Sequence, residues 1–157
     1  GIGLTDVLPD FNGLAVRLLD AHGEGRDQDL LLVSSGRLPV GRHVLVPVPF
    51  VGWTGYSSIL PYRSPEGLRV LGAAPFEGLT SAGVRRSLPV EVRILGASLL
   101  GAWEPEVDLT LTEPLDGPSC EALRFDPWHT GPRFLPAGVL NRLRLPAYAA
   151  SQAARRP

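Results

Sequence analysis

The chain has 157 residues, of which 44% are hydrophobic and 20% are charged, and its formal net charge is −1. This composition is typical of one globular domain with a single substantial core, and the small net charge gives no support for binding nucleic acid or a membrane surface. All fifteen basic residues are arginine, so the lysine that a P-loop nucleotide site requires is absent.

The single cysteine, Cys120, excludes an internal disulfide bond and favours a reducing, cytoplasmic location. No apolar run approaches the ~18 residues of a transmembrane helix, which predicts a soluble protein. The chain lacks an initiator methionine, which suggests that it begins inside a longer protein or after processing.

The first predicted element is a β-hairpin. Two apolar runs, Asn12 to Asp20 and Asp29 to Ser35, flank a turn that contains Gly23 and Gly25. The run Leu30 to Val33 is apolar at every position, which is typical of a strand buried on both sides or lining a filled barrel.

Shorter strands are predicted farther along the chain. Arg42 to Val48 is expected as a strand that ends in prolines, and residues 52–58 as a loop or short helical turn. The further strands are expected in two antiparallel pairs, Ile59 to Tyr62 with Leu68 to Ala74 and Leu88 to Leu100 with Val107 to Leu115. Six to eight short strands without an internal repeat predict a mainly β fold.

Other chemistry has little support in the sequence. The three histidines, His22, His43 and His129, lack ligand spacing, and no Cys–His cluster indicates zinc or non-haem iron. His43 is expected as a paired or exposed strand histidine. The carboxylates Glu104, Glu106 and Asp108 are expected to form a solvated turn rather than an acid–base pair.

A late helix is predicted from Pro136 to Arg155, with a kink or break at Pro146. At 100° per residue, the face of Tyr148 carries Arg144, Ser151, Gln152 and Arg155. A nearby cation favours the ionised phenol, and tyrosinate is a known haem ligand. The alternative is a surface helix whose tyrosine packs and whose arginines are solvated.

This stretch resembles the proximal haem helix of catalases, Arg-Leu-Phe-Ser-Tyr-x-Asp-Thr-x-x-x-Arg, in its two arginines, its tyrosine and its hydroxyl residue. Phe125-Asp126-Pro127 is similar to the segment that leads into that helix. The N-terminal hairpin resembles the catalase sequence Asp-x-x-Gly-Phe-Ala-Val-Lys-Phe…Trp-Asp-Leu-Val-Gly-Asn-Asn, and Asp108-Leu109-Thr110 resembles a catalase Asp-Leu-Thr. The hairpin residues that match are Asp10, Gly13, Ala15, Val16, Arg17, Asp29 and Leu30.

The resemblance implies one domain with an antiparallel catalase-like β-barrel, residues 10–125, followed by a loop and a proximal helix, residues 126–157. The N-terminal part that carries the distal histidine in catalases is absent from this chain. By the same resemblance, Tyr148 is the axial ligand of haem b and Arg144 stabilises its anionic form. Arg155 would serve a propionate or the same charge network, and Ser151 and Gln152 would line the proximal face.

The distal side differs from that of catalases. Their distal asparagine falls on Val33, with Ser34 beside it, so the iron is expected to face an apolar wall of Leu31 and Val33. The implied function is therefore a haem oxidoreductase that acts on a peroxide or an organic hydroperoxide, rather than an efficient catalase. The alternative is a non-catalytic β-barrel that binds haem or a small apolar ligand. Neither function involves nucleic acid or a membrane, and homo-oligomeric assembly is left open.

Overall fold

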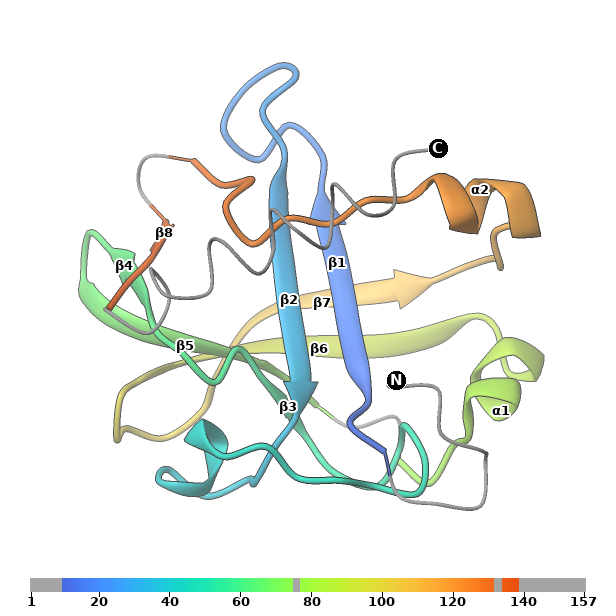
Figure 1. The fold of residues 1–157 in the computed structure, drawn as a ribbon, viewed down its shortest axis with the longest axis horizontal. Coiled ribbons are helices and arrows are strands. Elements are labelled where there is room, and N and C mark those ends of the chain that lie inside the picture. Colours follow the sequence, from blue (N-terminus) through green and yellow to red (C-terminus); the bar gives the residue numbers. More distant parts are fainter. Residues whose placement is uncertain (1–9, 75–76, 132–133, 139–157) are drawn as a thin grey trace.

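The computed structural model describes residues 10–74, 77–131 and 134–138. Its strands form one antiparallel sheet that curls into half a barrel, so the mainly β prediction is confirmed (Figure 1). The strands are β1 (Gly13–Leu18), β2 (Gln28–Ser34), β3 (Tyr56–Ser57), β4 (Tyr62–Ser64), β5 (Gly67–Ala73), β6 (Val90–Ser98), β7 (Glu104–Leu111) and β8 (Leu135–Pro136). The helices are a 3₁₀ turn, η1 (Gly41–His43), and two short α-helices, α1 (Ser81–Arg86) and α2 (Gly117–Ala122).

Strand β5 organises the sheet. It pairs with β6 along one side, and with β4 and then β3 along the other. Among the described strands, β1 pairs only with β2 and β7 only with β6, so the sheet is not closed into a full barrel. The β1–β2 hairpin crosses over β6 and β7 in Figure 1, and residues of all four strands pack into one core.

The two faces of β2 differ in burial. Leu30 and Leu32 are 4% and 3% exposed and point into the core. Leu31 and Val33 lie on the opposite, outer face and are half-buried. This alternation follows from the period of two along a strand. The run was predicted to be buried on both sides or to line a filled barrel, but only one of its faces is fully buried.

Three predicted pairings are confirmed, with shifted ends. The N-terminal hairpin is β1–β2, the second hairpin is β4–β5, and the long pair is β6–β7. The second hairpin starts later than expected because Ile59 has a positive φ of 62°, which an extended strand does not allow. Strand β7 starts earlier than expected, at Glu104, so the predicted solvated turn of carboxylates is instead part of a strand.

The predicted strand from Arg42 to Val48 is wrong. Its first residues belong to η1, and the remainder forms only isolated bridges at Leu45 and Val48. The Arg42 side chain is 1% exposed and donates to the Gly101 carbonyl at 2.7 Å while it stacks on Trp103, 4.1 Å from the ring centroid. These long-range contacts draw Arg42 inward and replace strand pairing. His43 is paired as expected, but in η1, with its ring nitrogens near two backbone carbonyls.

Two further elements differ from prediction. Residues 52–58, expected as a loop or turn, contain β3, which pairs with β2 and β5. The helices α1 and α2 are six residues each and were not predicted, although Thr80 and Asp116 cap them through side-chain acceptors. Helices this short have no apolar period that a sequence could reveal.

The predicted C-terminal helix is wrong at its start. Leu135–Pro136 forms β8, which pairs with β4, and Ala137 and Gly138 are not helical. The rest of the predicted helix lies outside the described residues. None of the helices in the described part of the chain is long and apolar enough to cross a membrane.

Candidate functional site

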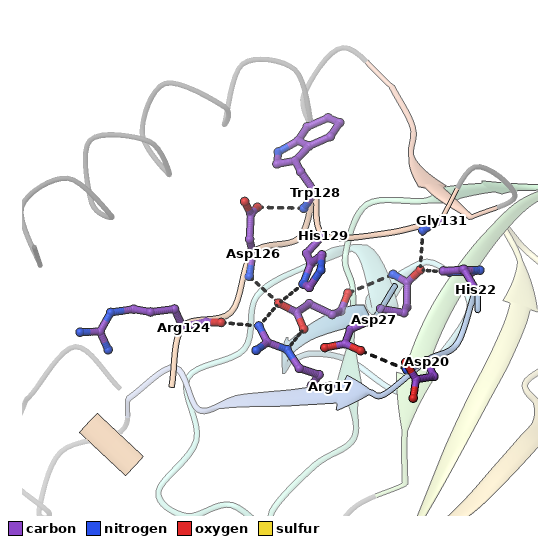
Figure 2. Close-up of polar contacts among 11 residues, drawn as sticks. Arg17, Asp20, His22, Asp27, Arg124, Asp126, Trp128, His129 and Gly131 are labelled. Atoms are coloured by element: carbon purple, nitrogen blue, oxygen red, sulfur yellow. Dashed lines mark hydrogen bonds and ion pairs between the residues drawn. The ribbon is translucent and has the colours of Figure 1, made fainter. Parts of the chain in front are cut away.

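A buried carboxylate lies at the centre of the main polar cluster. Asp29 on β2 is 0% exposed and faces Arg17 on β1 in the strand register. The Arg17 guanidinium donates to both carboxylate oxygens, from Nε to Oδ1 at 2.7 Å and from Nη2 to Oδ2 at 2.8 Å (Figure 2). This two-pronged geometry is the strongest form of side-chain ion pair.

The chain segment 124–131 covers this pair on the outer face of the hairpin. The backbone N–H of Asp126 donates to Asp29 Oδ2 at 2.9 Å, and the N–H of Asp29 donates to the carbonyl of His129 at 2.8 Å. Arg17 also donates to the Arg124 carbonyl and lies over the Phe125 ring, 5.3 Å from its centroid. The His129 Nδ1 atom is 3.6 Å from Asp29 Oδ2. The segment is thus attached to the hairpin through the side chains of Arg17 and Asp29 and through the Asp29 backbone (Figure 2).

The environment of Asp29 keeps it ionised. Burial by itself raises the pKa of the carboxyl, but hydrogen bonds from Arg17 and Asp126 and the Arg17 charge outweigh that effect. The pKa of Asp29 therefore lies below its usual range. The hydrogen bond to Asp29 raises the pKa of Arg17. Both partners hold their charges across the neutral range.

A second connection lies beside the first. Gln28 is 3% exposed. Its Oε1 lies 2.9 Å from His22 Nε2 and accepts a hydrogen bond from the backbone nitrogen of Gly131 at 3.4 Å. Its Nε2 donates to the Asp29 carbonyl at 3.1 Å. A Cβ at Gly131 would collide with the His22 ring, so only glycine fits there. The two connections occupy the polar groups of the cluster. The cluster therefore positions the segment rather than presenting a reactive group.

Only Val33 among the predicted site residues lies in the described part of the chain. It pairs with Gly13 and Ser57 in register and shares the outer face of β2 with Leu31. On the neighbouring strand Gly13 and Ala15 are exposed, so the outer face of the hairpin carries an apolar strip beside Asp29. The other predicted site residues lie outside the described residues; they are Arg144, Tyr148, Ser151, Gln152 and Arg155.

The sequence interpretation missed the Arg17–Asp29 ion pair. Both residues were matched only to the family pattern, although opposite charges near the same end of two predicted hairpin strands are a signal for cross-strand pairing. The burial of Asp29 had no local signal, because the segment that covers it is about a hundred residues away in the chain.

A cavity of about 340 Å³ lies inside the half-barrel, away from the outer face. Its walls are overwhelmingly apolar, and Leu18, Leu30, Leu71, Ile94 and Phe134 are among them. The lining also includes polar side chains, among them His22, Gln28, Glu66, Arg69 and Glu106. Its volume lies at the lower end of the range for small-molecule sites.

Within the described ranges, no group of three or more His, Cys, Asp or Glu side chains could hold a metal ion. Comparison of the chain with protein-family models, with curated proteins and with solved structures gives no match.

Proposed function

We propose that the chain is a haem-binding oxidoreductase of the catalase-like type, which acts on a peroxide or an organic hydroperoxide. The observation that carries the proposal is the hydrogen bond from the Asp126 N–H to Asp29 Oδ2. It joins two segments that both resemble catalase sequence, although they are 97 residues apart in the chain. A catalase-like fold would require these two segments to lie together, and their contact supports the proposal in that sense.

The outer face of the hairpin fits a planar, apolar group. Leu31 and Val33 supply apolar side chains. On the paired strand, Gly13 has no side chain and Ala15 only a methyl group, so neither projects far from the sheet. In the sequence, the attached segment precedes Tyr148, the proposed axial ligand. Haem b, when bound, supplies the redox chemistry of its iron.

The residues of this face determine which substrate is favoured. Leu31 and Val33 exclude water, and neither can accept or donate a proton. Proton transfer by a positioned side chain is typically worth 10²–10⁴-fold in rate. A face without such a group disfavours hydrogen peroxide and favours a bulky organic hydroperoxide, which gains from apolar contact.

The proposal is tested by placing a bulky side chain on the outer face. Val33→Trp should lower the affinity for haem at least tenfold, because the indole occupies the surface on which the macrocycle would lie. Thr110→Trp, at an exposed position of β7, is the matched control and should bind haem as the wild type does. Haem titration followed by absorbance measures both variants. Wild-type affinity in Val33→Trp would show that haem, if bound, lies elsewhere.

The interior cavity favours a second candidate function, a β-barrel that binds a small apolar ligand without turnover. The cavity is separate from the outer face, because inward and outward side chains alternate along β2. A concave, mostly apolar lining with a few polar groups is the usual form of a small-molecule site.

A further inference from the structure

Part of the lining of the interior cavity is shaped by an irregularity in the β6–β7 pair. Ile94 faces Val107 and Leu95 faces Pro105, so Glu106 is an extra residue on β7. In a regular strand Glu106 and Val107 would point to opposite faces, but both line the cavity. A bulge of this kind re-aims a side chain, and bulges are common beside functional sites.

The sheet makes room for the re-aimed carboxylate. A Cβ at Gly96 would collide with the Glu106 carboxylate and with the Arg69 guanidinium, so the absence of a side chain at Gly96 allows this ion pair to lie against the sheet. Arg69 is also 3.5 Å from the carboxylate of Glu66 and 3.5 Å from that of Glu104. Its charge is therefore shared among three acidic partners.

The net charge of the acidic and basic side chains in the lining is consequently negative. Glu66 and Glu106 contribute two carboxylates to the described cavity lining, and Arg69 contributes one guanidinium. An anionic ligand would have to compete with three carboxylates for Arg69. A cationic ligand would be attracted by the net negative charge of Glu66, Glu106 and Arg69, which lies beside the apolar part of the cavity.

We propose that the cavity binds a small apolar cation, an aryl- or alkylammonium ion. Its apolar body lies against Leu71, Ile94 and Phe134, and its ammonium group lies at the carboxylates of Glu66 and Glu106. This inference rests on the second candidate function, since it names the ligand class of the same cavity.

The test uses three probes with one apolar body: 3-phenylpropylammonium, 3-phenylpropan-1-ol and 3-phenylpropanoate. Their dissociation constants from the full-length protein are measured by NMR titration at low salt. Pairing with a partly exposed carboxylate is worth up to about 1 kcal/mol, or about fivefold in affinity. The ammonium should therefore bind about fivefold more tightly than the alcohol, and the carboxylate should bind most weakly.

Two variants separate the cavity from the charge. Val107→Trp, at a half-exposed position of the cavity lining, should weaken all three probes at least tenfold by filling the entrance. Glu106→Gln should reduce the preference for the ammonium over the alcohol towards one. Glu91→Gln, an exposed glutamate on β6 that does not line the cavity, is the matched control and should keep the preference.

The measurements distinguish a wrong ligand class from a cavity that binds no ligand. If the carboxylate binds as tightly as the ammonium to the wild-type protein, the cation inference is overturned while the cavity remains a ligand site. If no probe binds, or Val107→Trp leaves every affinity unchanged, the cavity is not a ligand site and the second candidate function fails with it.

Discussion

At the scale of the residue, the buried Asp29 carboxylate binds both Arg17 on β1 and the backbone of the segment that covers the hairpin. Asp29→Asn keeps the shape of the side chain but removes the charge that Arg17 and the Asp126 N–H require. Removing one partner of a buried ion pair typically costs at least 3 kcal/mol. We therefore expect the free energy of unfolding, measured by urea titration, to fall by about 3 kcal/mol.

A control for this variant lies elsewhere in the same sheet. Arg93 and Asp108 face each other across β6 and β7 with the same two-pronged geometry, but both are exposed. Asp108→Asn should change the stability very little, because solvent screens an exposed pair. If the two substitutions lowered the free energy of unfolding equally, the burial of Asp29 would not be the cause of its contribution to stability.

The contribution of Asp29 to stability should also depend on pH. The pKa of Asp29 is lowered in the folded state, so its contribution is present above the unfolded value of about 3.9 and is lost as the pH falls through the folded value. The difference in unfolding free energy between the wild type and Asp29→Asn should be constant above about pH 5 and should shrink below about pH 4. A difference that stays constant down to pH 2 would contradict this assignment.

At the scale of the element, β2 is a strand with two surfaces. Leu32→Ala should cost about 3 kcal/mol, because the side chain is 3% exposed and its loss leaves a cavity. Leu31→Ala, its half-buried neighbour on the outer face, should cost about 1 kcal/mol. Urea unfolding of the two variants measures the contrast. Similar losses would mean that both faces of β2 are equally packed.

The elements that could be predicted from the sequence have a local cause. Alternating apolar residues and turn glycines or prolines are sufficient to predict β1–β2, β4–β5 and β6–β7, because each pair closes a short connection. The remainder depends on distant partners. Arg42 turns inward because Gly101 and Trp103 receive it, and β8 exists because Tyr62 and Arg63 offer an edge. No local pattern contains that information.

At the scale of the whole molecule, the half-barrel presents two separate surfaces. The concave side holds the core and a mostly apolar cavity whose lining includes Glu66 and Glu106. The outer face of the hairpin holds the apolar strip of Leu31 and Val33. The catalase resemblance predicted an apolar wall of Leu31 and Val33, whereas its place on the outer face of β2 is known only from the structure. The cavity could not be predicted, because its lining comes from six strands, from the turns beside them and from Phe134.

The central claim is that the chain binds haem through Tyr148 against this outer face. Its most direct test is the absorption spectrum of the full-length protein, produced with haem available, together with a pyridine assay for bound haem. We expect about one haem per chain and a ferric tyrosinate spectrum. In Tyr148→Phe that spectrum should be lost while the fold remains, because the ring is kept and only the ligating oxygen is removed. A wild-type protein without a Soret band, or a Tyr148→Phe variant with an unchanged spectrum, would contradict the claim.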